Sequence, residues 1–213
     1  MTKSIETDIL IIGAGPVGLF TVFEAGLLGL KCHLVDNLDK IGGQCIELYP
    51  EKPIYDIPGV PNQTGKEHID SLLKQIEPFD YEVHLNQRVD KIEESGDYWI
   101  AETTDGISFK TLNIFIAAGA GSFEPRKPPV ESPDKFLGKG IDYAVRSVDK
   151  YKDKDIVIFG GGDSALDWSV ELANKAKSIK LVHRRDDFRG AEHTENKMRN
   201  FVASGEIELK IPF

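Results

Sequence analysis

A short apolar run that ends in a glycine motif is the feature that most constrains this chain. Residues 8–12 read D-I-L-I-I, and residues 13–18 read G-A-G-P-V-G. A near-continuous apolar run is typical of a parallel strand that is buried on both faces. In the G-x-G-x-x-G pattern, Gly13 permits a tight turn, Gly15 lets a pyrophosphate approach the backbone, and Gly18 lets the next helix pack on the strand. The sequence therefore predicts a strand–turn–helix unit that binds a dinucleotide.

An acidic residue supports this interpretation. A second apolar run, residues 31–35, ends in Asp36. An acid about 20 residues beyond the glycines binds the ribose hydroxyls in this motif. The alternative is a glycine-rich turn that holds no ligand. With Asp36 in place, the pattern favours a site for FAD or NAD.

The motif occurs a second time. Residues 155–159 form an apolar run, and residues 160–165 read G-G-G-D-S-A. Gly160 and Gly162 take the first two glycine positions of the motif, and Ala165 takes the third, which accepts glycine or alanine. A predicted strand at 178–182 follows, but basic residues stand where the first copy has its acid: His183, Arg184, Arg185 and, just beyond, Arg189. Arginines supply planar donors for a 2′-phosphate. This copy is therefore predicted to bind NADP(H), the alternative being a solvated basic turn. Two different nucleotide sites indicate hydride transfer between a nicotinamide and a flavin.

A second glycine-rich segment, residues 41–45, follows the first motif. Gln44 offers a donor and an acceptor for the polar edge of an isoalloxazine ring. Tyr49 either stacks on a flavin or is an ordinary core or surface tyrosine, and spacing leaves both interpretations open. Cys32 is expected to be buried and inert, and a redox role for Cys45 is the less favoured alternative.

The segment between the two motifs carries further structural signals. Thr64 is a plausible N-cap for a helix over residues 65–76. Residues 87–112 alternate and predict a small antiparallel meander laid on the parallel sheet, and residues 113–117 predict another buried strand. Prolines in residues 123–133 favour an interdomain crossing. We therefore expect an α/β fold with two Rossmann-like domains with doubly wound parallel sheets, an FAD-binding domain at 1–122 and an NADP-binding domain at 123–213.

Composition excludes several function classes. The formal net charge of −9 argues against sequence-independent nucleic-acid binding, which needs a basic face. No apolar run approaches the length of a bilayer span, so no membrane partner is expected. The N-terminal residues lack a signal-peptide pattern, which predicts a cytoplasmic protein. Two cysteines outside a C-x-x-C pattern predict no metal site.

The order of these motifs resembles the thioredoxin-reductase-type flavoproteins. It includes G-A-G-P-V-G, G-G-Q, Y-P-E-K at residues 49–52, D-I-P-G at 56–59, A-A-G at 117–119, G-G-G-D-S-A and H-R-R-D-D-F-R at 183–189. Within that group the chain is most similar to the ferredoxin (flavodoxin)–NADP reductases. Thioredoxin reductases carry a C-x-x-C pair before the second glycine motif, whereas residues 143–148 here read Y-A-V-R-S-V. The resemblance therefore implies direct electron transfer from a flavin to a carrier protein.

The resemblance also implies cofactors, partners and residue roles. It implies FAD and NADP(H), ferredoxin or flavodoxin as the electron carrier, and a homodimer. Asp36 would bind the adenosine ribose of FAD, Gln44 and Tyr49 would meet the flavin, Val89 would lie at the adenine and Phe123 near the cofactor. The basic residues after 182 would hold the 2′-phosphate, and no side chain is expected to act as a catalytic acid or base. Family members are longer, so we expect the C-terminal part of the FAD domain to be missing. The alternatives are a disulfide reductase and an inactive nucleotide-binding fragment.

Overall fold

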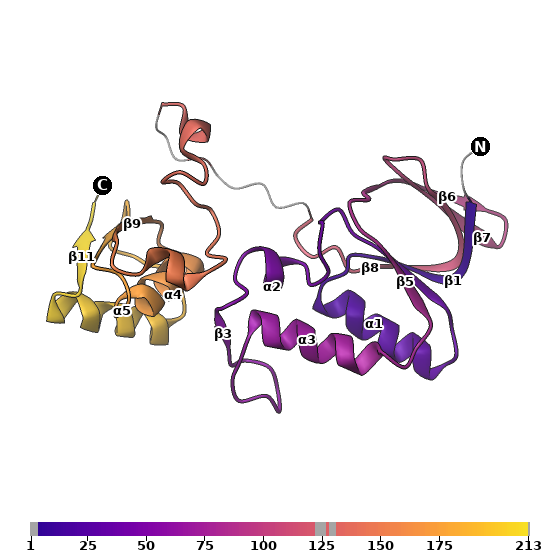
Figure 1. Cartoon of the computed structure of the whole chain (residues 1–213), viewed down its shortest axis with the longest axis horizontal. Helices are drawn as coiled ribbons and strands as arrows, with labels where there is room; N and C mark the ends of the chain where they lie inside the picture. Colours follow the sequence, from indigo (N-terminus) through magenta and orange to yellow (C-terminus); the bar gives the residue numbers. More distant parts are fainter. Residues whose placement is uncertain (1–3, 122–126, 128–130, 213) are drawn as a thin grey trace. The chain divides into compact units, whose positions relative to one another are not determined.

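The computed structural model describes residues 4–121, 127 and 131–212 (Figure 1). The chain forms two compact units, which divide between Arg146 and Ser147. The predicted domain boundary at 122/123 and Phe123 lie outside the described residues, so both stay predictions. Among the described residues, no helix combines the length and the apolar character that crossing a bilayer requires.

The first unit is built on a six-stranded sheet in the order β5-β2-β1-β8-β7-β6. Strands β5, β2, β1 and β8 are parallel to one another, whereas β7 pairs antiparallel with both β8 and β6. The strands are β1 (Ser4–Ile12), β2 (Cys32–Val35), β5 (Tyr81–His84), β6 (Val89–Ser95), β7 (Tyr98–Thr103) and β8 (Ser108–Ile116); a separate short pair is β3 (Pro53–Ile54) with β4 (Gln63–Thr64).

The meander differs from the sequence prediction in two respects. Residues 108–116 form one strand, β8, rather than the end of a hairpin followed by a separate buried strand. The meander strands also extend the parallel sheet instead of lying on it. The physical reason is that β8 pairs along its whole length with β1 and through its first half with β7, so one strand serves both arrangements.

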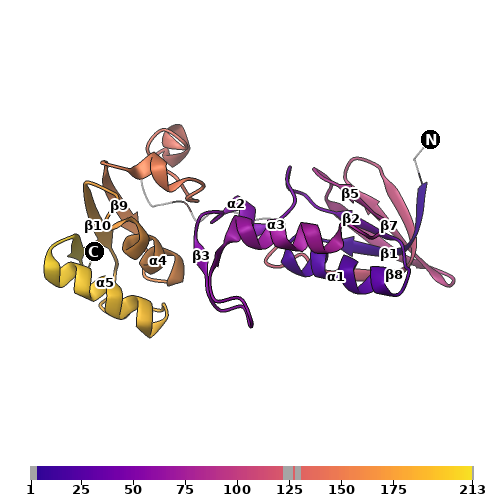
Figure 2. The ribbon, with the colours of Figure 1, turned by 60° about the horizontal axis from the view of Figure 1, so that its bottom comes forward.

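Helices α1 (Pro16–Leu27) and α3 (Gly65–Ile76) run side by side along one face of this sheet (Figure 2). Leu19 and Val22 of α1 and Ile69 and Ile76 of α3 are buried in the core beneath them. The predicted N-cap of α3 is confirmed, because the Thr64 hydroxyl accepts a hydrogen bond from the Glu67 amide in a complete capping box. A four-residue helix, α2 (Gln44–Glu47), lies between β2 and β3 in the sequence.

The second unit is a three-stranded parallel sheet in the order β11-β10-β9. Its strands are β9 (Asp155–Phe159), β10 (Ser178–Val182) and β11 (Ile207–Lys210), and its helices are α4 (Asp163–Leu172) and α5 (Glu192–Ser204). Short 3₁₀ helices are η1 (Pro133–Phe136), which belongs to the first unit, and η2 (Val148–Tyr151), which opens the second. The strand–glycine–helix–strand order that the sequence predicts for this unit is confirmed.

Candidate functional site

The turn after β1 has the backbone that the glycine motif predicts. Gly13 has a φ of +110°, a conformation that favours glycine. Its amide donates to the carbonyl of Val35 at the end of β2 (2.8 Å). A side chain here would also collide with the backbone of Ala117, just beyond β8. Gly13 thus turns the chain at the carboxyl ends of three neighbouring strands.

The other two glycines of the motif differ in what surrounds them. A Cβ on Gly18 would overlap the carbonyl oxygen of Gly13, so this position needs glycine for the helix to pack against the turn. A Cβ on Gly15 would meet only the Cα of Gly43, at 3.8 Å, which is an ordinary contact. Gly15 is the N-cap of α1, where backbone amides point out of the helix. The described residues do not require a glycine at position 15, and the open space there is what the approach of an anion to a helix N-terminus needs.

Asp36 lies at the edge of this turn. Its carboxylate accepts hydrogen bonds from the Ala14 amide (2.7 Å) and from the Leu38 amide (2.9 Å), one on each oxygen. A carboxylate has about four acceptor positions, so each oxygen keeps one for another donor. The structure therefore holds Asp36 beside the glycine turn with capacity left for ribose hydroxyls.

The second glycine segment packs directly against the first. Gly42 (φ +120°) donates its amide to the Ala14 carbonyl at 2.9 Å. A Cβ on Gly43 (φ +57°) would come to 3.0 Å from the Cα of Gly15. The two loops are therefore in backbone contact, and Gln44 begins α2 immediately beyond them. This places Gln44 next to the predicted nucleotide loop.

The side chains of Tyr49, which is half-buried, and Cys45, which is buried, contact each other. The Cys45 thiol, buried, donates to the Tyr49 hydroxyl at 3.8 Å. Burial raises the pKa of Cys45, and burial followed by the Cys45 charge raises the pKa of Tyr49 to about 12. The Tyr49 ring also packs against the core cluster under α1 and α3. Part of the Tyr49 side chain thus has the core role that the sequence left open, and its stacking on a flavin stays a prediction.

Val89 opens β6 close to the same turn. The Gln87 amide donates to the Asp36 carbonyl and the Asn86 amide to the Leu38 carbonyl, both at 2.9 Å. The segment that enters β6 therefore runs beside the segment that carries Asp36. Val89 follows two residues later and packs on the core of the opposite sheet face.

The glycine loop of the second unit has the same backbone features as the turn after β1. Gly160 has a φ of +143°, and its amide donates to the Val182 carbonyl at 3.1 Å, as Gly13 donates to Val35. Gly162 is the N-cap of α4, and a Cβ there would meet nothing within 4 Å. Gly162 is thus open, as Gly15 is, and the predicted correspondence between the two motifs holds at the level of single hydrogen bonds.

The basic residues after β10 lie against this loop. The Arg189 amide donates to the Gly161 carbonyl at 2.7 Å. The His183 ring covers Gly161 so closely that a Cβ there would overlap it, and it packs against the Phe188 ring at 5.2 Å. The side chains of Arg184, Arg185 and Arg189 are exposed, and none of them forms an ion pair in the part of the chain that the structure describes. Arginines next to an open helix N-terminus form a site suited to a phosphate.

Two residues that hold this loop were not among the sequence predictions. The Asp163 carboxylate accepts from the Ala191 amide at 3.0 Å, which ties the start of α4 to the start of α5. Arg199 pairs with Asp186 (3.3 Å) and lies over the Phe188 ring at 5.4 Å. Asp163 directly follows the last glycine, which is a signal that sequence could have used. Arg199 lies ten residues past the basic turn, and only the structure shows its role.

The comparisons with known proteins agree with this geometry. The sequence profile of the family described as "Pyridine nucleotide-disulphide oxidoreductase" matches residues 7–211. The chain belongs to this family. Two curated relatives named ferredoxin–NADP reductase, from Bradyrhizobium sp. (strain BTAi1) and Rhodopseudomonas palustris (strain BisB18), are 56% and 55% identical to it over 212 residues. Each match covers 99% of this chain and 62% of the relative, so the chain spans less than two thirds of their length.

Solved structures of the family support the predicted fold. The crystal structure of Lactococcus lactis thioredoxin reductase has a TM-score of 0.81 at 26% identity, over 97% of this chain and 64% of that one. The thioredoxin reductase of T. acidophilum also has a TM-score of 0.81, at 17% identity and with the same coverage, which bears on the fold alone. The predicted resemblance to thioredoxin-reductase-type flavoproteins and the α/β class are thus confirmed.

Proposed function

We propose that this chain is the nucleotide-binding part of an FAD-dependent oxidoreductase that transfers electrons between NADPH and ferredoxin or flavodoxin. One observation carries the proposal: two glycine loops share their backbone geometry but end in opposite charges, Asp36 in the first and, in the second, arginines that form no ion pair with any described residue. The names of the relatives, ferredoxin–NADP reductase, support the same reaction.

The residues of the first loop fit FAD. The open approach to Gly15 accepts a pyrophosphate on the α1 N-terminus, and the spare acceptor positions of Asp36 accept ribose hydroxyls. Gln44 and Tyr49 are proposed to meet the flavin and Val89 the adenine, while the role of Phe123 stays a prediction. Bound FAD would supply the exchange of a hydride with a nicotinamide and of single electrons with a carrier.

The second loop fits NADP(H) rather than NAD(H). Arg184, Arg185 and Arg189 are exposed and carry no ion pair within the described residues, so a 2′-phosphate would not have to displace a carboxylate. An acid at the end of β10 would repel that phosphate, and His183 stands there instead. The charges of these residues thus favour NADP(H) over NAD(H).

A disulfide reductase is the less favoured alternative. Cys32 and Cys45 are both buried free thiols, and burial raises the pKa of each, that of Cys32 to about 11. A thiolate is the reactive form of cysteine, so neither side chain is prepared to attack a disulfide near neutral pH. The carrier, the homodimer and the cytoplasmic location stay predictions from the sequence.

The first experiment tests both cofactors in the absorption spectrum. The purified chain is titrated with FAD, and NADPH or an equal amount of NADH is then added without oxygen. A perturbed flavin band that bleaches faster with NADPH supports the proposal. Equal bleaching by the two nicotinamides would contradict the role of the arginines.

A calorimetric titration tests the second loop without a flavin. We expect adenosine 2′,5′-bisphosphate to bind and adenosine 5′-phosphate to bind much more weakly. Arg184→Ala and Arg185→Ala should each remove about 1–2 kcal/mol, roughly five- to thirtyfold in Kd. Lys197→Ala removes an exposed cation from α5 of the same unit and serves as the control. An equal loss in the control would point to net charge instead of a defined phosphate site.

A further inference from the structure

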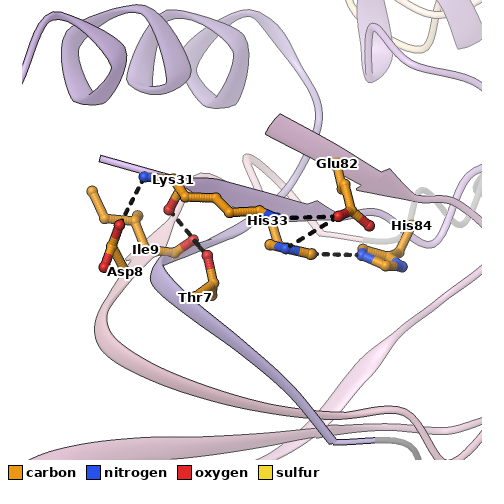
Figure 3. Close-up of polar contacts among 7 residues, drawn as sticks. All are labelled: Thr7, Asp8, Ile9, Lys31, His33, Glu82 and His84. Atoms are coloured by element: carbon orange, nitrogen blue, oxygen red, sulfur yellow. Dashed lines mark hydrogen bonds and ion pairs between the residues drawn. The ribbon is translucent and has the colours of Figure 1, made fainter. Parts of the chain in front are cut away.

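Three metal-binding side chains meet on one face of the first sheet, opposite the face that α1 and α3 cover (Figure 3). Strand β5 carries Glu82 and His84 two residues apart, so both point to the same face. The parallel register places His33 of β2 opposite Glu82 and Val35 opposite His84. His33 therefore lies opposite Glu82 on that face and also reaches His84. Neighbouring strands bring together a set that is far apart in the sequence.

The distances within this set suit a single small cation. Each residue offers one ligand atom, and these atoms all lie within 4.8 Å of one another. His33 Nε2 lies 3.8 Å from Glu82 Oε1, whereas His33 Nδ1 is hydrogen-bonded to His84 Nε2 at 2.9 Å, so an ion at His33 Nε2 requires the His84 ring to turn from that bond. Zinc binds imidazole nitrogen at about 2.0–2.1 Å and carboxylate oxygen at about 2.0–2.2 Å, so an ion fits between two atoms that are 3.8 Å apart.

His33 supplies an observation that points independently to a ligand. Its side chain is 2% exposed, and its Nε2 has no hydrogen-bond partner among the residues that the structure describes. A buried polar atom without a partner is unfavourable, because it loses its bonds to water and gains none. This atom faces the Glu82 carboxylate across the 3.8 Å gap. A bound cation would satisfy it.

We propose that His33, Glu82 and His84 bind Zn²⁺, with a water molecule completing a tetrahedral site. Two histidines and one carboxylate are a ligand set that zinc accepts in proteins with one position left open. β5 is the edge strand of the sheet, and the ion would join its end to β2. This site goes beyond the proposed redox function and does not depend on it.

An aromatic ring lines the proposed metal site. The Phe109 ring stands edge-on to His33 and His84, at 6.0 Å and 5.1 Å, and walls the site on its inner side.

Lys31 is the competitor that a metal must displace. Its ammonium lies 3.3 Å from Glu82 Oε1, and its side chain is 40% exposed. A long exposed side chain can turn away into water at little cost, since surface ion pairs contribute only about 0.2–1 kcal/mol. Removing this lysine should therefore strengthen metal binding, which is a prediction specific to this geometry.

The experiment is a calorimetric titration of the chain with Zn²⁺ after chelator treatment and dialysis. We expect one Zn²⁺ per chain. Glu82→Gln and His84→Gln alter exposed and half-buried positions, and each should weaken binding at least about tenfold, as the loss of even an outer-shell partner does. Lys31→Ala should tighten it about two- to fivefold. His193→Gln removes an exposed imidazole from α5 and is the matched control.

Several outcomes would overturn the proposal. They are the absence of binding at about 100-fold excess of Zn²⁺, equal loss in the His193→Gln control, and unchanged binding in both His84→Gln and Glu82→Gln. Loss of binding in Cys45→Ser with binding retained in His84→Gln would assign the ion to a thiol instead. Circular dichroism of each variant separates loss of the site from loss of the fold, and a Zn²⁺-dependent rise in Tm should occur in the unaltered chain and not in His84→Gln.

Discussion

Alanine at Gly15 and at Gly18 should separate the two roles that glycine has in the first motif. A Cβ on Gly18 would lie well inside 3.0 Å of the Gly13 carbonyl oxygen, a distance that Cβ atoms essentially never show. A Cβ on Gly15 would meet only one atom, at 3.8 Å. Gly18 is thus required by the fold, whereas Gly15 is proposed to leave room for a ligand, so the two variants should fail in different assays.

The cost of Gly18→Ala follows from two opposing contributions. Overpacking of a rigid backbone contact costs about 3 kcal/mol. Alanine in a helix recovers about 1 kcal/mol relative to glycine, and Gly18 lies inside α1. The net loss is about 2 kcal/mol, which lowers Tm by roughly 4–8 °C for a domain of about 150 residues. Thermal unfolding followed by circular dichroism measures this shift.

Gly15→Ala should leave Tm nearly unchanged, because its backbone (φ −79°) and its neighbours accept a methyl group. It should weaken FAD binding by about 1–3 kcal/mol, or roughly five- to 150-fold in Kd, since the methyl group takes the space of the pyrophosphate. Fluorescence titration with FAD measures this change. An unchanged Kd in Gly15→Ala, or an unchanged Tm in Gly18→Ala, would refute the assignment of these roles.

Three further predictions concern pH, thiols and capping. Burial lowers the pKa of His33 from its ordinary value of 6.5, so just below that pH the unfolded chain binds more protons than the folded chain. The contribution of His33 to stability should therefore be complete above about pH 6.5 and should fall on acidification. His33→Gln should flatten the dependence of Tm on pH. His68, whose pKa burial also lowers, should leave a smaller slope of the same sign in that variant. Cys32 and Cys45 should react with a thiol reagent only at the rate of unfolding, and a fast phase in the native protein would contradict their burial. Thr64→Ala should lower the free energy of unfolding by about 1 kcal/mol, measured by urea denaturation, and a neutral effect would show that the capping box contributes nothing.

The sequence predicted the loops well because their signals are local. A glycine at a positive φ, such as Gly13 or Gly160, and a capping residue such as Thr64 act within a few positions of themselves. The same locality explains the error at β8. Residues 108–116 alternate like a hairpin strand at one end and run apolar like a buried strand at the other, and only the pairing with both β1 and β7 joins them.

The set of His33, Glu82 and His84 was beyond sequence reasoning for a related reason. The spacing of Glu82 and His84 is visible in the sequence, but their approach to His33 depends on the register of β2 against β5. A shift of one residue would turn the β5 side chains to the opposite face. Tyr49 shows the reverse case: spacing could not choose between core and flavin, and the structure shows contacts to the core and to Cys45.

The side chains proposed to bind the two cofactors differ in how much they also stabilise the fold. In the first unit, the Asp36 carboxylate accepts hydrogen bonds from the Ala14 and Leu38 amides, so it holds the turn as well as offering oxygens to the proposed ribose. Replacing it would leave two backbone donors without their partner, which costs stability in addition to affinity. In the second unit, Arg184 and Arg185 are exposed and form no ion pair within the described residues. The proposed preference for NADP(H) should therefore be open to change without disturbing the structure, whereas the proposed binding of FAD at the first loop is tied to its folding.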